Sequence, residues 1–148
     1  MELNTSFGDL FAYTGARDHK KDQPAVVFIH GTGMDHTVWV LPSRYFARHG
    51  FNVLSIDLPG HGKSSGASSE TIDEMADAVI ESMHAAGISN AAIVGHSMGS
   101  LVALSAAARY PDRARSLALI GTTAPMGVHP DMMASAQKND HDVIDMIT

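Results

Sequence analysis

The amino-acid sequence predicts an α/β fold, a mostly parallel open sheet with helices on both faces. Four short apolar segments of strand length alternate with segments that have helical spacing. Three of the four apolar segments end in glycine-rich loops that carry polar residues. Strands that alternate with helices pair in parallel, because each crossover helix returns the chain to the same edge of the sheet.

Local sequence patterns predict the position of each strand and helix. In chain order we expect a hairpin over residues 2–14, buried parallel strands over 25–29, 53–56, 91–94 and 117–121, and helices over 37–49, 72–86 and 101–109. Gly8-Asp9 is the turn signal of the hairpin, and Thr71 with Glu74 forms a capping box. A glycine or a proline ends each helix. Residues 124–148 are weakly helical and differ in character from the rest.

The three polar loops span residues 30–34, 57–64 and 95–99, and each follows the carboxyl end of a predicted strand. The carboxyl ends of parallel strands meet at one edge of the sheet, where such folds bind their ligands. We therefore expect the three loops to form one site.

The last of these loops reads Gly95-His96-Ser97-Met98-Gly99, which fits the pattern G-x-S-x-G. It lies between an apolar strand and a helix of small residues. A serine on such a turn is a nucleophile elbow, because the turn lifts its Oγ clear of both elements. The helix that follows points its positive end at the same place, which favours a developing oxyanion.

Composition excludes several classes of function. The chain has 148 residues, 45% of them hydrophobic and 18% charged, which fits one globular domain. The net charge of −6 and the lack of a basic cluster argue against nucleic acid. There is no cysteine, no basic and apolar leader and no apolar run of membrane-spanning length, so we expect a cytoplasmic protein without a membrane partner.

Two nucleotide-binding motifs are only partly matched. The sequence Gly31-Thr32-Gly33 resembles the start of a dinucleotide fingerprint, but His36 stands where the third glycine belongs. The sequence Gly62-Lys63-Ser64 resembles the end of a P-loop without its first glycine. We expect neither cofactor, and we expect Asp57 to anchor its own loop by accepting backbone hydrogen bonds.

The three loops together resemble the α/β-hydrolase fold superfamily, in particular its capped serine hydrolases. The resemblance rests on residues 30–34, 57–64 and 95–99, in the right order and at the right strand ends. It implies that Ser97 is the nucleophile and that the backbone N–H of Met98 is one oxyanion-hole donor. The second donor lies in the loop that follows His30 and Gly31, where we favour Met34 and then Gly33.

The resemblance covers only the N-terminal part of that superfamily's fold. The family places an acid and then a histidine after the serine. Here the place after the strand at 117–121 reads Gly121-Thr122-Thr123-Ala124, without an acid. We expect residues 1–123 to form the N-terminal part of the core domain and residues 124–148 to begin a helical cap. The last strands and both partners of Ser97 are expected to be missing.

For several other candidate site residues, the sequence leaves both a functional and a structural role open. His30 acts as a catalytic base, binds substrate or shapes the oxyanion loop, and Gly31 binds substrate. Trp39 lines an acyl pocket or packs in the core, and Met126 contacts substrate or belongs to a bare apolar face. His129 and His141, with Asp131, Asp140, Asp142 and Asp145 nearby, form a makeshift dyad with Ser97 or are solvated residues of the cap. No set of residues has the spacing of a metal site.

The sequence therefore predicts a serine hydrolase of a small ester, thioester or lactone that acts through an acyl-enzyme at Ser97. Carbon–carbon bond hydrolysis and cofactor-free perhydrolysis use the same machinery. The alternative is a non-catalytic remnant, or one half of a split hydrolase. The strand at 117–121 is expected to present a bare apolar edge, through which the chain pairs with a second copy or with a complementing chain.

Overall fold

The computed structural model describes residues 1–123, 125–127 and 130–138. Its strands are β1 (Glu2–Thr5), β2 (Gly8–Tyr13), β3 (Ala25–Ile29), β4 (Asn52–Ile56), β5 (Ala91–His96) and β6 (Ala114–Ile120). Its helices are α1 (Val40–Arg48), α2 (Ile72–Ala85), α3 (Met98–Arg109) and α4 (Pro130–Gln137), with short 3-10 helices η1 (His36–Trp39) and η2 (Pro111–Arg113).

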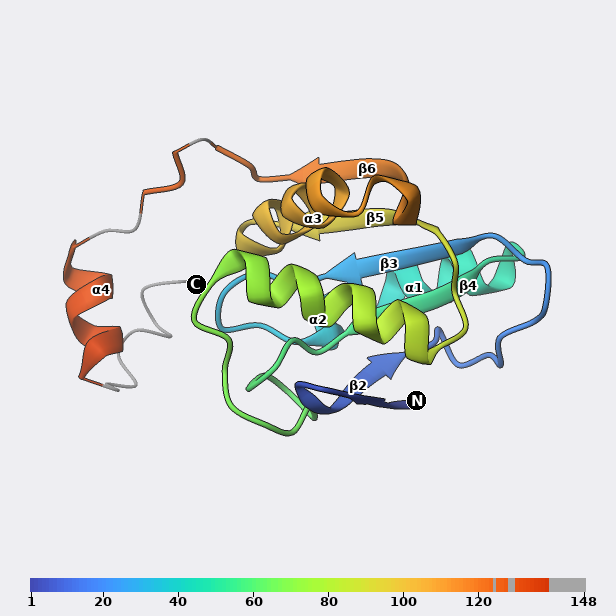
Figure 1. Ribbon diagram of the computed structural model, residues 1–148, viewed down its shortest axis with the longest axis horizontal. Helices are drawn as coiled ribbons and strands as arrows, with labels where there is room; N and C mark the ends of the chain where they lie inside the picture. Colours follow the sequence, from blue (N-terminus) through green and yellow to red (C-terminus); the bar gives the residue numbers. More distant parts are fainter. Residues whose placement is uncertain (124, 128–129, 139–148) are drawn as a thin grey trace.

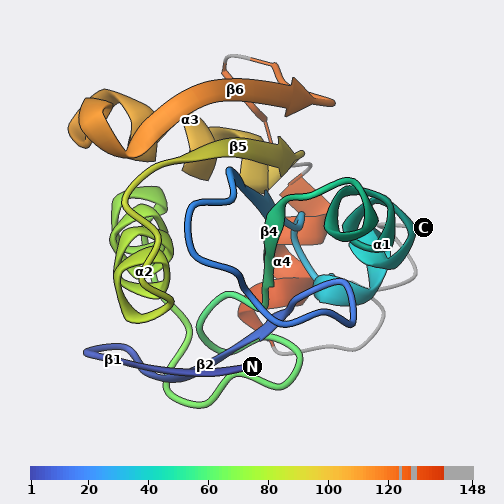
Figure 2. The same cartoon turned by 90° about the vertical axis from the view of Figure 1, so that its right-hand side faces the viewer.

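The strands form one sheet in the order β1-β2-β4-β3-β5-β6. Strands β4, β3, β5 and β6 are parallel, and β2 joins them antiparallel to β4. Helices α2 and α3 lie on one face and α1 lies on the other (Figures 1 and 2). The predicted fold class is confirmed, a mostly parallel open sheet with helices on both faces.

Burial follows the layers of the fold. Every residue of β3 and β4 is buried, because helices cover both faces of these two strands. The larger core cluster lies under α2 and α3 and includes Ile29, Leu54 and Ile93. The smaller cluster lies under α1 and includes Phe28 and Trp39, whose ring centroids are 5.1 Å apart.

Helix α2 begins with the capping box that the sequence predicts. The hydroxyl of Thr71 accepts a hydrogen bond from the Glu74 amide at 3.2 Å, and the Glu74 carboxylate accepts from the Thr71 amide at 3.2 Å. The two side chains thus satisfy two of the amide groups that have no partner within the helix.

The hairpin turn differs from the prediction. It lies at Ser6 and Phe7, and Gly8 already belongs to β2. The hydroxyl of Thr5 accepts from the Phe7 amide at 3.2 Å and donates to the Gly8 carbonyl at 2.7 Å, so a threonine side chain closes this turn. Gly8 has a φ of 103°, a backbone conformation that favours glycine.

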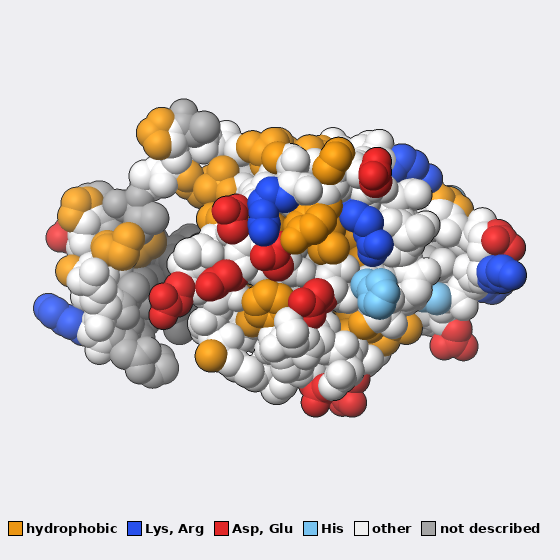
Figure 3. Space-filling model, in the orientation of Figure 1, with side chains coloured by type: hydrophobic (Ala, Val, Ile, Leu, Met, Phe, Trp, Pro, Cys, Tyr) orange, Lys and Arg blue, Asp and Glu red, His pale blue; other side chains and the backbone are white. Residues whose placement is uncertain are grey.

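Strand β6 is also more exposed than its apolar sequence predicts. It begins at Ala114, and every residue from Arg115 to Ile120 is exposed. Its outer edge has no neighbouring strand in the described part of the chain. The expected bare edge is therefore present, whereas the expectation of a fourth buried strand is wrong. Apolar side chains gather along this side of the molecule in Figure 3.

Helix α4 lies apart from the sheet and from helices α1, α2 and α3 (Figure 1). Residues 124, 128–129 and 139–148 lie outside the described part of the chain. The division into a core over 1–123 and a cap that starts at 124 stays a prediction. None of the described helices combines the length and the apolar character needed to span a bilayer.

The capping box yields a stability prediction. Replacing Thr71 with alanine removes the acceptor of the Glu74 amide, and we expect it to lower the free energy of unfolding by about 1 kcal/mol. Chemical denaturation measures the change. The control is Thr122→Ala, an exposed threonine outside the helices, which should leave stability unchanged. Equal effects of the two substitutions would contradict the capping role.

Candidate active site

The turn between β5 and α3 holds Ser97 in an unusual backbone conformation. Its φ of 53° and ψ of −124° put a residue with a side chain in a region that usually takes glycine. Such conformations cost about 1–3 kcal/mol and persist where the surrounding structure enforces them. Helix α3 starts at the next residue, Met98, so Ser97 lies at its positive end.

Two glycines allow this turn to be so tight. A Cβ on Gly95 would overlap the carbonyl oxygen of Gly99, and a Cβ on Gly99 would overlap the carbonyl oxygens of Ile29 and His30. The first turn of α3 therefore lies directly against the ends of β5 and β3. Any side chain at either glycine would push the helix away from the sheet.

Hydrogen bonds fix the backbone of Ser97 on both sides. Its amide donates to the carbonyl of Ile120 in β6 at 2.9 Å. Its carbonyl accepts from the amide of Ser100 at 2.9 Å and from the hydroxyl of Ser100 at 2.5 Å. The hydroxyl of Ser97 accepts or donates no hydrogen bond within residues 1–123, 125–127 and 130–138.

The loop after β3 lies beside this serine. A Cβ placed on Gly31 would be 3.2 Å from the Cβ of Ser97, and the hydroxyl of Thr32 donates to the sulfur of Met98 at 3.4 Å. The amide of Met34 donates to the Gly31 carbonyl at 3.3 Å. In the described part of the chain, the amides of Met98 and Thr32 have no such partner.

His30 holds the start of this loop from inside the protein. Its side chain is completely buried. Its Nδ1–H donates to the Gly31 carbonyl at 2.8 Å, and its Nε2 accepts from the Leu58 amide at 3.1 Å. Both ring nitrogens are engaged, and no surface remains for a substrate. His30 thus ties the loop after β3 to the loop after β4.

Burial also disfavours the charged form of His30. Desolvation lowers the pKa of its imidazole, and the neighbouring ring of His61, 4.9 Å away between centroids, lowers it further. The hydrogen bond to the Gly31 carbonyl and the carboxylates of Asp57 and Asp35 act in the opposite direction, but desolvation is the largest effect and the pKa is lowered overall. The ring is therefore neutral, as its pair of hydrogen bonds requires.

Asp57 holds the far end of the same loop. Its buried carboxylate accepts from the amide of His36 at 2.6 Å, from the Nδ1–H of His36 at 2.9 Å and from the amide of Lys63 at 2.9 Å. The expectation that Asp57 accepts backbone hydrogen bonds is confirmed. The sequence did not predict His36 as its partner, because nothing local relates the two positions.

The side chains of Asp35, His36 and Asp57 lie close enough together to be tested as ligands of one metal ion. One ligand atom from each lies within 4.8 Å of the others. However, Asp35 accepts from the amide and the hydroxyl of Thr37, and N–H groups surround the carboxylate of Asp57. A cation would have to displace these donors, so the set of groups does not fit a metal.

An apolar pocket of about 280 Å³ opens on the α1 side of the elbow. Met34, Val38, Trp39, His96 and Ile120 line it. Met34 comes from the loop after β3 and His96 directly precedes Ser97, so the pocket adjoins the serine. Trp39 lines this pocket and also packs in the core cluster under α1, and its role in binding an acyl group stays a prediction.

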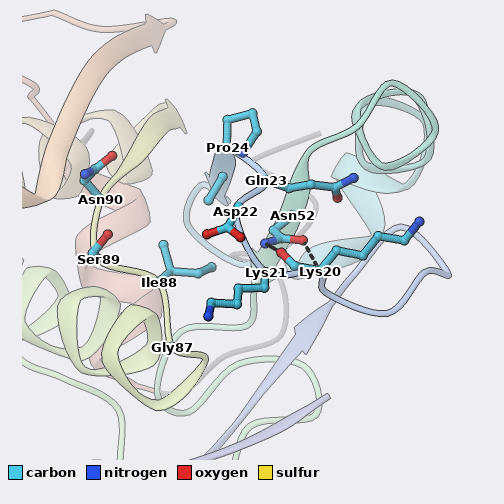
Figure 4. Close-up of a pocket in the computed structure, with 11 residues that line it drawn as sticks. Lys20, Lys21, Asp22, Gln23, Pro24, Asn52, Gly87, Ile88, Ser89 and Asn90 are labelled. Carbon is cyan, nitrogen blue, oxygen red and sulfur yellow. Dashed lines mark hydrogen bonds between the residues drawn. The ribbon is translucent and has the colours of Figure 1, made fainter.

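A second hollow, of about 300 Å³, lies at the opposite end of the sheet (Figure 4). It lies between the loop before β3 and the loop from α2 to β5. The Asn52 side chain bonds the backbone of Lys20 there, at 2.9 and 2.8 Å. Because it adjoins the amino ends of β3 and β5, this hollow is not part of the candidate site.

The remaining site predictions concern the C-terminal segment. His129, His141, Asp140, Asp142 and Asp145 lie outside the described residues. Asp131 lies in α4, and Met126 is half-buried in the segment before it. The structure thus brings together the loops at 30–34, 57–64 and 95–99, without a base at Ser97 in the described part of the chain.

Comparison with known proteins gives one consistent family. Residues 24–147 match the family described as alpha/beta hydrolase fold. A pimeloyl-[acyl-carrier protein] methyl ester esterase of Chromobacterium violaceum is 38% identical over 114 residues, which are 77% of this chain and 42% of that protein. An (E)-2-((N-methylformamido)methylene)succinate hydrolase of Acinetobacter baylyi is 33% identical over 96 residues, 64% of this chain and 36% of that protein.

A solved structure agrees with these relatives. The N-acyl homoserine lactonase AidH, complexed with N-butanoyl homoserine, superimposes with a TM-score of 0.75 and 28% identity, over 91% of this chain and 52% of that one. The chain thus spans less than half the length of the two curated relatives and about half of the solved one.

The geometry at Asp57 leads to a stability prediction. Asp57→Asn replaces an acceptor by an NH₂ group that faces N–H donors. We expect the free energy of unfolding to fall by about 3 kcal/mol, because buried donors lose their partner. Asp112→Asn, at an exposed position, is the control and should cost almost nothing. Denaturant titration of both variants measures this, and equal stability of the two would contradict the anchoring role.

Burial of His30 leads to a pH prediction. The unfolded chain takes up a proton near the ordinary histidine pKa of about 6.5, whereas folded His30 resists protonation because its pKa is lowered. Its contribution to stability is therefore complete above pH 6.5 and declines as the pH falls below it.

Thermal unfolding of the wild type and of His30→Asn, measured from pH 7.5 to 5, tests this expectation. The wild type should lose stability more steeply on acidification than the variant does. His84→Gln, at an exposed position on α2, should keep the wild-type slope. Parallel curves for the wild type and His30→Asn would show that His30 does not titrate on unfolding.

Proposed function

The chain belongs to the alpha/beta hydrolase fold family, and on that premise we propose that it is a serine hydrolase acting on a small ester, thioester or lactone through an acyl-enzyme at Ser97. The observation that carries the proposal is the backbone of Ser97, held at a φ of 53° between β5 and α3. A serine gains nothing in stability from this conformation, but its Oγ then stands clear of both elements.

In the proposed reaction a base from outside the described part of the chain takes the proton of the Ser97 hydroxyl as its Oγ attacks the substrate carbonyl carbon. The new C–O bond forms as the carbonyl oxygen takes on negative charge. Collapse of this intermediate breaks the bond to the leaving oxygen or sulfur, which leaves with the proton that the base returns. Water then attacks the acyl-enzyme, releases the acid and restores the hydroxyl of Ser97.

The oxyanion needs two donors, and the amide of Met98 is the first of them. As the first residue of α3 it has no partner within the helix. For the second donor the sequence favours Met34 and then Gly33. We now favour Thr32 as the second donor. The Met34 amide already donates to the Gly31 carbonyl, whereas the Thr32 amide has no backbone partner in the described part of the chain. The Thr32 hydroxyl also donates to the sulfur of Met98, which brings this residue beside the first donor. One such donor contributes about 3–4 kcal/mol to the transition state.

The pocket beside Ser97 supports an apolar acyl group. Its lining contains one polar side chain, His96, among four apolar ones. The relatives act on bonds of the proposed class, since one is named a methyl ester esterase and another an N-acyl homoserine lactonase. The absence of cysteine from the sequence favours a reducing compartment, and we place the protein in the cytoplasm.

The alternative proposal is a half of a split hydrolase, or a scaffold without catalysis. The observation in its favour is the Ser97 hydroxyl, which has no base within hydrogen-bond distance in the described part of the chain. A serine without a base is a weak nucleophile at neutral pH. Such a half keeps its oxyanion donors and loses most of its rate.

A fluorophosphonate probe separates the two proposals. The hydrolase proposal expects one adduct per chain in intact-mass measurements, mapped to the peptide that contains Ser97 and lost in Ser97→Ala. Ser116→Ala, an exposed serine on β6, should label like the wild type. Absence of any adduct on the folded protein would contradict the hydrolase proposal and favour the scaffold.

A further inference from the structure

The two proposed oxyanion donors lie on different loops. Met98 follows β5, and Thr32 lies in the connection after β3. Each donor must lie about 2.7–3.1 Å from the oxyanion, so a small shift of one loop against the other weakens at least one of the two hydrogen bonds. The proposed reaction therefore requires a contact that fixes the spacing of these two amides.

The tip of the loop after β3 has few restraints of its own. Thr32 lies between two glycines, of which Gly33 has a φ of 69°. Glycine leaves the backbone more conformational freedom than any other residue does. The Met34 amide closes the turn on the Gly31 carbonyl, and His30 holds only the start of the loop. The position of Thr32 therefore depends on what its side chain contacts.

One side-chain contact joins this tip to the turn that carries Ser97. The hydroxyl of Thr32 donates to the sulfur of Met98 at 3.4 Å. Within residues 1–123, no other hydrogen bond connects residues 31–34 to residues 95–99. Met98 is half-buried and packs against the larger core cluster under α2 and α3. The core thus fixes the thioether, and the thioether in turn holds the exposed Thr32.

We propose that the Thr32 side chain is a positioning group for the reaction, which holds the Thr32 amide at a fixed spacing from the Met98 amide through its hydrogen bond to the Met98 sulfur. This inference rests on the proposed function. The same two residues supply both oxyanion donors and the side-chain contact between them. A change in the contact therefore acts directly on the spacing of the donors.

The contact suits a positioning role better than a role in stability. A thioether sulfur is a weak acceptor and Thr32 is exposed, so loss of the hydroxyl should change the stability of the fold little. A displaced amide acts instead on the transition state, where the carbonyl oxygen carries its charge. We therefore expect loss of the hydroxyl to slow the chemical step and to leave ligand binding unchanged.

Methyl NMR tests the contact without any need for activity. In protein whose methionines carry 13C at the methyl group, Met98→Leu identifies the Met98 signal. Thr32→Val, which removes the hydroxyl, should shift this signal, and Thr32→Ser, which restores a hydroxyl, should return it toward its wild-type position. Thr37→Val is the matched control, because Thr37 is an exposed threonine of the same connection whose hydroxyl donates to Asp35 at 2.6 Å. A Met98 signal that Thr32→Val does not move, or that Thr32→Ser moves equally, would overturn the proposal.

The rate of fluorophosphonate labelling at Ser97 tests the role in the reaction, because the phosphonyl oxygen takes the place of the oxyanion. Thr32→Val should lower the limiting labelling rate by about tenfold, at an unchanged half-saturating probe concentration and denaturation midpoint. Thr32→Ser should restore most of the rate, and Thr37→Val should label like the wild type. The double variant Thr32→Val/Met98→Leu should be no slower than the slower single variant, because both substitutions remove the same contact.

These outcomes separate the two proposals. A wild type that takes up no probe contradicts the hydrolase proposal, and the positioning role fails with it, whatever the NMR shows. A wild type that labels at Ser97 while Thr32→Val labels equally fast keeps the hydrolase proposal and overturns the positioning role alone. A Thr32→Val defect that comes from weaker probe binding or lower stability, or rates that fall additively in the double variant, would overturn the positioning role as well.

Discussion

The backbone of Ser97 is the constraint around which the other parts of the site are arranged. A φ of 53° on a serine requires support from every neighbouring element. Gly99 allows α3 to lie against the carbonyl oxygens at the end of β3, and the Ile120 carbonyl of β6 receives the Ser97 amide. Three strands and one helix therefore meet at a single residue. We take this cost in backbone energy as the sign of a functional position.

Polar contacts between loops hold the rest of the site in place. His30 and Asp57 are both completely buried, and each connects the loop after β3 to the loop after β4. His30 accepts from the Leu58 amide, and Asp57 accepts from the His36 amide and ring. The loop that carries the proposed second oxyanion donor is thus fixed at both ends. A neutral histidine suits its role because it can both donate and accept, and an aspartate suits the other because its two carboxylate oxygens accept several N–H groups.

The sequence predicts what depends on neighbouring residues and misses what depends on distant ones. Residues 25–29 and the capping box of Thr71 and Glu74 are set by local pattern, and the structure has both as predicted. The order of glycines around Ser97 likewise predicts a tight turn. The His36–Asp57 contact joins residues 21 positions apart, and no local pattern contains it. The exposure of β6 also depends on which helices cover it, which its apolar sequence does not reveal.

Formation of an acyl-enzyme at Ser97 can be followed with a chromogenic ester. The protein is mixed with p-nitrophenyl butyrate, and released p-nitrophenol and intact protein mass are followed together. We expect a burst of one p-nitrophenol per chain and a protein heavier by one butyryl group, attached to the peptide that contains Ser97. Release of p-nitrophenol without this adduct, at the same rate in Ser97→Ala, would show that Ser97 forms no acyl-enzyme.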